Sequence, residues 1–167
     1  MGRKINIIGF DLDGVVFRPP VPFYGLIKGI DFNFLVSKLK GKNAFRKFFY
    51  DGMKINSQIK ELLKNLKKKG YKIVAISGHS AECEADVTDC LKRNNIFFHD
   101  LYLCPNGDSH KKFKLEKIKE TNCAFYVEDR WDIVDFLRKK AGDICHIIHY
   151  HKRQSVIEEL DALLNLR

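Results

Sequence analysis

The stretch that decides the fold is "NIIGFDLDGVVF", residues 6–17, in which an apolar run ends in two acidic residues. A short, continuous apolar run followed by a polar turn is typical of a buried β-strand. Asp11 and Asp13 therefore stand where this strand should end, and Gly14 follows them as a turn residue. Because neighbouring carboxylates repel each other unless a cation lies between them, this position indicates a site rather than a plain turn.

Four later segments repeat the pattern of the first strand. The predicted strands are residues 4–10, 72–77, 98–103, 124–128 and 144–150. Apolar residues at helical spacing fall between or after them, near residues 59–66, 87–91, 115–118, 134–137 and 156–164. The first of these helices has Asn56 or Ser57 as a candidate cap and Gly70 as its end. Strands that alternate with helices predict an α/β fold with a parallel sheet, in which ligands bind beyond the carboxyl ends of the strands.

The connection after the first strand is too long for a plain crossover. It begins with "RPPVP", residues 18–22, whose prolines disfavour early helix or sheet pairing. Patches of helical spacing follow, so residues 17–54 are predicted to form a small helical cap inserted into a core made of residues 1–16 and 55–167.

The net charge of +9 is concentrated in this insertion. Residues 17–56 carry eight basic and two acidic residues. A field of that sign attracts anionic ligands, such as phosphate esters or nucleic acid.

The five cysteines and the amino-terminal sequence indicate the compartment. The number of cysteines is odd, and the opening "MGRKINIIGF" has too short an apolar stretch for a signal peptide and none for a membrane span. We expect a cytoplasmic protein with reduced thiols and no membrane partner. Cys145, His146, His149 and His151 could ligate a metal, but no paired spacing recurs elsewhere, and "ICHIIHY" is better explained as a strand.

Polar residues gather at the ends of the other predicted strands. Ser77 and Gly78 end the second strand, and Glu128 and Asp129 end the fourth, with Asp132 nearby. Lys114 opens the helix before that fourth strand, although Lys111 and Lys112 compete with it. Carboxylates converging on one edge favour a hard divalent cation, and Mg²⁺ typically binds one or two carboxylates together with phosphate oxygens. The set therefore suits phosphoryl transfer on a small anionic phosphorylated substrate.

These residues resemble the four motifs of the haloacid dehalogenase superfamily, which is dominated by Mg²⁺-dependent phosphatases. The matching elements are "DLDG", the serine of "AISG", Lys114 and the acidic pair "ED", in that order. The resemblance covers nearly the whole chain outside the insertion. It implies a Rossmann-like, three-layer α/β/α core with about five parallel strands and a small helical cap after the first strand.

The resemblance also implies a role for each residue. Asp11 would attack phosphorus and form an aspartyl-phosphate, and Asp13 would act as general acid and base. Asp129, an oxygen of Asp11 and the backbone carbonyl of Asp13 would hold Mg²⁺, with Glu128 or Asp132 acting through water. The phosphate would be bound by Ser77 and Lys114 and by the backbone amides of Leu12 and Gly78.

Within the superfamily, the position of the cap and the motifs "AISG" and "VEDR" look most like the 5′-nucleotidase or deoxyribonucleotidase branch. Arg18, Phe23, Tyr24 and Lys28 are candidate cap residues for contact with a nucleotide. Phosphatases that act on nucleic-acid 3′-phosphate ends have similar motifs and form the alternative. A phosphotransferase and a noncatalytic binding module with this fold remain open, since residue order specifies neither the geometry of the cap nor the oligomeric state.

Overall fold

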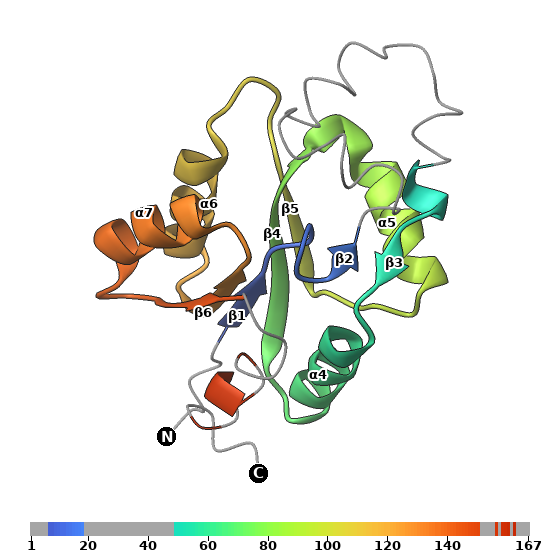
Figure 1. The fold of residues 1–167 in the computed structure, drawn as a ribbon, viewed down its shortest axis with the longest axis horizontal. Helices are drawn as coiled ribbons and strands as arrows, with labels where there is room; N and C mark the ends of the chain where they lie inside the picture. Colours follow the sequence, from blue (N-terminus) through green and yellow to red (C-terminus); the bar gives the residue numbers. More distant parts are fainter. Residues whose placement is uncertain (1–6, 19–48, 151–155, 157, 161, 163–167) are drawn as a thin grey trace.

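The centre of the molecule is a five-stranded parallel sheet in the order β5-β4-β1-β6-β7 (Figure 1). The computed structural model describes residues 7–18, 49–150, 156, 158–160 and 162. The five strands are β1 (Ile7–Phe10), β4 (Lys72–Ser80), β5 (Asp100–Cys104), β6 (Cys123–Glu128) and β7 (His146–His149). The predicted five-stranded parallel sheet is confirmed. Because β1 is the middle strand, the residues that follow it lie at the centre of the carboxyl edge.

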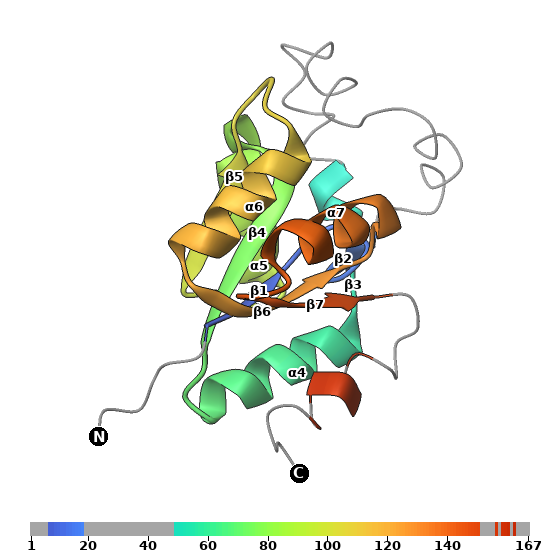
Figure 2. The ribbon, with the colours of Figure 1, turned by 90° about the vertical axis from the view of Figure 1, so that its left-hand side faces the viewer.

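Helices cover both faces of the sheet and make three layers, and four of them have bounds within residues 49–150 (Figure 2). They are α4 (Ser57–Lys68), α5 (Glu84–Arg93), α6 (His110–Glu120) and α7 (Trp131–Ala141), and a short 3-10 turn, η1 (Ala81–Cys83), precedes α5. Ile8 and Phe10 of β1 belong to the same apolar core as the inner sides of α4 and α5, whereas Tyr126 of β6 belongs to the core under α6 and α7. Successive side chains of a strand point to opposite faces, so each strand supplies both cores.

Local chemistry explains why α4 forms where the sequence predicts it. The Asn56 side chain accepts a hydrogen bond from the backbone N–H of Ile59, which makes it the N-cap. The helix buries a stripe of four side chains, Ile59, Leu62, Leu63 and Leu66. Gly70 follows with a φ of +83°, a conformation that favours glycine.

Two predicted boundaries near the site were wrong. β4 does not end at Ser77 but continues to Ser80, with an irregular register between these two residues where it pairs with β5. Lys114 does not open its helix, because α6 begins at His110 and places Lys114 one turn further along, on its buried side. Both errors concern where an element stops, which depends on the neighbouring strand or helix and not on local pattern alone.

The described ends of the insertion pair with each other. β2 (Phe17–Arg18) runs antiparallel to β3 (Lys54–Ile55), so the predicted boundaries of the cap fall inside this small ladder. Phe49 and Tyr50 are buried in the core shared with α4 and α5. Arg18 is half-buried, whereas the other cap candidates, Phe23, Tyr24 and Lys28, lie outside the described residues, as does most of the predicted cap.

The cysteines and the described histidines of the C-terminal segment lie in the core or in strand β7. All five cysteines are buried free thiols. Cys145 precedes β7, which confirms the strand, and His146 Nε2 lies within hydrogen-bond distance of Glu159 Oε1, at 2.7 Å. His151 lies outside the described residues. Within the part of the chain that the structure describes, no helix is long and apolar enough to cross a membrane.

Candidate active site at the carboxyl edge of the sheet

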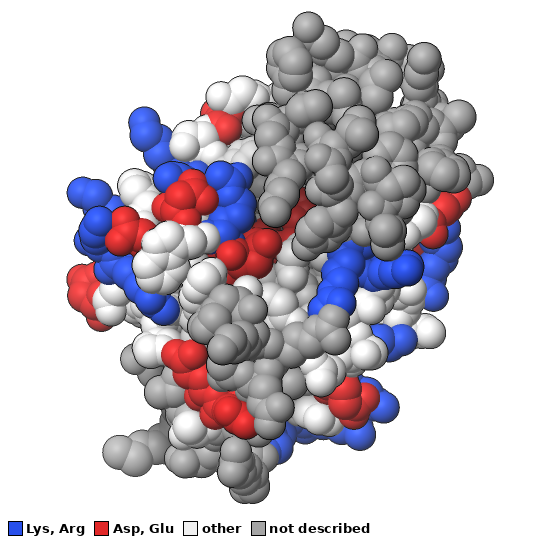
Figure 3. Space-filling model, in the orientation of Figure 1, with Lys and Arg blue, Asp and Glu red and all other residues white. Residues whose placement is uncertain are grey.

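Asp11 is the first residue after the central strand, and it is only 3% exposed. Its backbone N–H donates to the carbonyl of Val127 at 2.9 Å, which continues the ladder between β1 and β6 by one residue. Strand alternation places Asp11 on the same face as Gly9, which packs against Tyr126 beneath α6. Figure 3 shows acidic side chains gathered near the centre of this view of the molecule, with Lys and Arg side chains to both sides.

Lys114 reaches this carboxylate from α6. Its side chain is 2% exposed, and its Nζ lies 3.0 Å from Asp11 Oδ1 and 2.6 Å from Glu128 Oε2. Burial alone would lower the pKa of Lys114, but the two carboxylates outweigh this effect and raise it, so the lysine stays charged. Of the two competing lysines, Lys111 pairs with Asp132 at 2.9 Å, and Lys112 is exposed. The structure thus brings Lys114 to the site.

Asp11, Glu128 and Asp129 form a carboxylate cluster whose oxygens lie within 4.8 Å of one another. Burial raises the pKa of Asp11 to about 7 and that of Asp129 to about 8, and the mutual repulsion of the carboxylates adds to the effect. Lys114 opposes both shifts without cancelling them. Asp11 Oδ1 is buried and makes no hydrogen bond among the described residues, its contact with Lys114 being an ion pair. Three largely buried carboxylates with the single positive charge of the Lys114 ammonium against them form a set of oxygen ligands that fits a hard divalent cation.

The three carboxylates of this cluster differ in how many hydrogen bonds they accept from neighbouring protein groups. Glu128 is fully buried and accepts from Lys114, from the Tyr126 hydroxyl at 3.3 Å and from the backbone N–H of Arg130 at 3.2 Å. Asp11 and Asp129 are therefore better placed than Glu128 to hold a cation. Asp132, predicted as a residue acting through water, forms ion pairs with Lys111 and Arg130.

Gly14 makes room for the Asp129 carboxylate. Its φ is +74°, and a Cβ built on it would lie 1.9 Å from Asp129 Oδ2. Its backbone N–H donates to the carbonyl of Phe17 at 2.9 Å and closes the turn that holds Asp13. Glycine is needed here for both its conformation and its lack of a side chain.

The candidate phosphate-binding residues lie at the same edge. Ser77 is buried, and its Oγ accepts the backbone N–H of His79 at 3.3 Å, which leaves the hydroxyl proton for another acceptor. Gly78 lies beside His110, whose Nδ1 would be 2.9 Å from a Cβ at that position. Leu12 directly follows Asp11, with its side chain in the core.

The sequence analysis missed His79 and Tyr50. His79 Nε2 lies 3.0 Å from Asp13 Oδ1, and His79 Nδ1 lies 2.9 Å from the Tyr50 hydroxyl. Burial opposes the charging of both partners, but their attraction and hydrogen bond outweigh it, so the pKa of Asp13 is lowered and that of His79 is raised. His79 is only two residues beyond Ser77, a signal that could have been read, whereas Tyr50 comes from the end of the insertion.

The comparisons with known proteins identify similar folds. No family model matches the chain, and no curated protein matches it by sequence. By structure, it is similar to a chain of the Pnkp1/Rnl/Hen1 complex, with 19% identity and a TM-score of 0.63 over 89% of this chain and 47% of that chain. A second chain, from the Pnkp1/Rnl/Hen1 RNA repair complex, has 18% identity and a TM-score of 0.62 over 90% and 44%. This chain thus spans less than half the length of these two proteins.

Two similar structures of matching length carry the haloacid dehalogenase name. One is a haloacid dehalogenase-like family hydrolase from Streptococcus pneumoniae, with 15% identity and a TM-score of 0.61 over 93% of this chain and 98% of that chain. Another is a haloacid dehalogenase superfamily hydrolase, subfamily IA, from Geobacter sulfurreducens, with 14% identity and a TM-score of 0.57 over 93% and 100%. Together with the parallel sheet and its flanking helices, these likenesses show that the chain has the haloacid dehalogenase-like α/β fold.

Proposed function

We propose that the protein is a Mg²⁺-dependent phosphomonoester hydrolase that works through an aspartyl-phosphate on Asp11. One observation carries the proposal: Asp11 lies buried at the end of the central strand, 3.0 Å from the Lys114 ammonium and within the carboxylate cluster. This arrangement provides a nucleophile beside fixed positive charge, at the edge where ligands of parallel α/β sheets bind.

The reaction is a pair of displacements at phosphorus. An Asp11 oxygen attacks the phosphorus, the bond to the ester oxygen breaks, and Asp13 gives its proton to the departing alcohol. In the second step Asp13 takes a proton from water, which attacks the phosphorus and releases inorganic phosphate and the Asp11 carboxylate. Asp13 is suited to this exchange because its side chain is half exposed, whereas Asp11 is enclosed.

Fixed charges and dipoles at the site stabilise the transferring group. Lys114, the Ser77 hydroxyl and the backbone amides of Leu12 and Gly78 would bind the phosphoryl oxygens. Asp11 and Asp129, with the backbone carbonyl of Asp13, are the residues that would hold Mg²⁺, which neutralises phosphoryl charge when it is bound. Glu128 would keep Lys114 in place and charged.

For the substrate, we propose a small phosphorylated metabolite such as a nucleoside monophosphate, as expected for a 5′-nucleotidase. The second candidate is the 3′-phosphate end of a nucleic acid. It is favoured by the structural likeness to chains of an RNA repair complex and by the excess of basic residues at positions 17–56.

Phosphate release from a panel of mononucleotides, sugar phosphates and a 3′-phosphorylated oligonucleotide tests the proposal. We expect Mg²⁺-dependent release that EDTA and Asp11→Asn both abolish. The matched control is Asp135→Asn, which removes the carboxylate of α7 that forms a solvent-exposed ion pair with Lys139. Release that survives in Asp11→Asn would exclude the aspartyl-phosphate route. Absence of release from every substrate, by folded protein that binds Mg²⁺, would favour a noncatalytic binding module.

A further inference from the structure

Asp13 is bound by a chain of two buried side chains. His79 Nε2 contacts Asp13 Oδ1 at 3.0 Å, and the Tyr50 hydroxyl contacts His79 Nδ1 at 2.9 Å. His79 and Tyr50 are each 2% exposed, whereas the Asp13 side chain is 50% exposed. A buried, hydrogen-bonded imidazole thus holds one end of a carboxylate whose other end is open.

The extension of β4 places His79 at Asp13. Ser77 pairs with Leu103 and Ser80 with Cys104, so the two residues between them form a bulge against β5. Bulges redirect side chains and are frequent beside active sites. The imidazole packs edge-on to the Phe17 ring and against the Tyr50 ring, with centroids 6.4 Å and 5.7 Å away. The hydrogen bond between His79 and Tyr50 is buried among these rings, and burial strengthens it.

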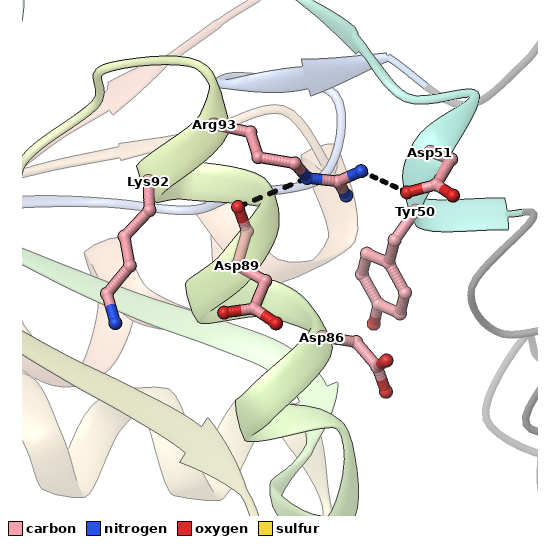
Figure 4. Close-up of a pocket in the computed structure, with 6 residues that line it drawn as sticks. All are labelled: Tyr50, Asp51, Asp86, Asp89, Lys92 and Arg93. Atoms are coloured by element: carbon pink, nitrogen blue, oxygen red, sulfur yellow. Dashed lines mark hydrogen bonds and ion pairs between the residues drawn. The ribbon is translucent and has the colours of Figure 1, made fainter.

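Residues 50 and 51 contact α5 through a hydrogen bond and an ion pair. The Tyr50 backbone carbonyl accepts from the Cys90 thiol at 3.6 Å, and the adjacent Asp51 forms an ion pair with Arg93. Figure 4 shows Arg93 also donating to the Asp89 carbonyl, at 3.4 Å, in a pocket of about 520 Å³ between residues 50–51 and α5. Residues 50 and 51, which end the inserted segment, are therefore attached to a helix of the core.

We propose that His79 is a positioning residue for the acid–base step, which orients Asp13 by holding its Oδ1 while Tyr50 fixes the imidazole. Proton transfer to and from substrate would then fall to Oδ2. This inference rests on the proposed function, because it assigns a partner to the proposed general acid and base.

The hydrogen-bond network defines the tautomer that this role requires. Asp13 Oδ1 can accept a hydrogen bond whether or not Oδ2 carries the proton that passes to the leaving group, so His79 Nε2 carries the proton that it donates to Asp13. Nδ1 accepts from the Tyr50 hydroxyl in the neutral imidazole, whereas in the imidazolium, which Asp13 favours, Nδ1–H donates to the Tyr50 oxygen. Burial raises the pKa of Tyr50 above its ordinary value, which keeps this hydroxyl protonated.

Two substrates of different leaving-group basicity separate this role from a merely structural one. An alkyl phosphate such as glycerol 2-phosphate needs a proton on its leaving oxygen, whereas p-nitrophenolate departs without one. In His79→Leu we expect turnover of the alkyl phosphate to fall about 10- to 100-fold, part of the usual contribution of general acid–base catalysis. The first release of p-nitrophenolate should change less than about 3-fold, because that step needs no proton.

The second step supplies a spectroscopic signature. Because Asp13 also activates water, p-nitrophenyl phosphate should give a burst of p-nitrophenolate in His79→Leu, with phosphorylated protein detectable by mass. His79→Gln, whose amide N–H can replace Nε2–H, should restore part of the alkyl phosphatase rate. Tyr50→Phe keeps the ring and removes only the hydroxyl, and should show the same pattern more weakly. Its control is Tyr71→Phe, which removes a hydroxyl just before β4 begins, at the opposite edge of the sheet.

The results for the His79 variants can be told apart from a failure of the proposed function itself. The positioning role would be overturned if the turnover rates of both substrates fell by the same factor in His79→Leu, with no burst and no rescue by His79→Gln. The proposed aspartyl-phosphate on Asp11 would not be affected by that result. Unchanged rates would overturn the positioning role as well. Absence of Asp11-dependent turnover in the wild-type protein would overturn the proposed function, and with it this inference.

Discussion

Gly14→Ala is expected to abolish cation binding while leaving the protein folded. The new Cβ would lie 1.9 Å from Asp129 Oδ2, so the carboxylate must withdraw by about 1.5 Å to reach ordinary contact. Mg²⁺ binds oxygen at about 2.0–2.1 Å and demands near-octahedral geometry. A ligand moved by this amount no longer reaches the ion.

A second glycine provides the matched control. Gly70 has a φ of +83°, close to the +74° of Gly14, but no atom lies within 4 Å of a Cβ built there. Alanine in this conformation costs about 1–2 kcal/mol of backbone strain, so Gly70→Ala should lose about that much stability. Gly14→Ala should lose the same amount plus the cost of displacing Asp129. That excess should shrink when both variants are compared in an Asp129→Ala background, which removes the two closest atoms and leaves only the Cβ of residue 129, at 3.0 Å.

Thermal and urea unfolding, each in EDTA and in excess Mg²⁺, measure both effects. With Mg²⁺ at one hundred times its dissociation constant, the wild-type protein and Gly70→Ala should gain about 2.7 kcal/mol of stability. Gly14→Ala should gain almost none. A Gly14→Ala protein that keeps the full Mg²⁺-dependent gain would refute the assignment of Asp129 as a ligand.

Three further predictions concern the buried charges and the cap of α4. Lys114→Met should lower the free energy of unfolding by about 3–5 kcal/mol at about pH 8 in EDTA, because it leaves buried carboxylates unpaired; a loss below about 1 kcal/mol in urea unfolding would contradict the ion pairs. Asn56→Ala should lower the free energy of unfolding by about 2–4 kcal/mol in the same measurement, because it removes the N-cap of α4. It also removes the amide that donates to the carbonyl of Val15 at 3.0 Å and to the Tyr150 hydroxyl at 2.5 Å. The pKa values of Asp11 and Asp129 are raised from 3.8 to about 7 and about 8. The protonated carboxyls therefore stabilise the metal-free protein fully at a pH below 3.8, and this stabilisation is lost by the time the pH has risen through 7 to 8. Mg²⁺ needs the ionised carboxylates, so the rise in Tm that it causes should be larger at about pH 9 than at about pH 6, and an equal rise at both would contradict the burial of these groups.

The sequence was sufficient to predict the architecture because its signals are local. Apolar runs of strand length, helical spacing and cap residues such as Asn56 act within a few neighbours along the chain. The position of Asp11 after β1 followed from the same run, and the handedness and short connections of βα units then bring strand ends to one edge. The sequence also offered Lys114, with Lys111 and Lys112 as alternatives, as the lysine that precedes the fourth strand.

Where β4 ends could not be predicted in the same way. Its last residues pair with β5 through a bulge, and the sequence of β4 alone does not reveal which residue the partner strand leaves unpaired. The sequence analysis therefore did not select His79, although it lies two residues after Ser77. Tyr50 could not be linked to His79 from the sequence, since the two residues are 29 positions apart.

The sequence by itself determined the alternation of strands and helices, the carboxylates at the strand ends and the excess of positive charge in residues 17–56. The tertiary structure alone decided which charges meet: Lys114 between Asp11 and Glu128, and Asp13 against His79. The physical reason is the range of the forces involved. Backbone preferences and apolar periodicity are set by adjacent residues, whereas an ion pair or a buried hydrogen bond forms only where packing brings distant segments within about 3 Å.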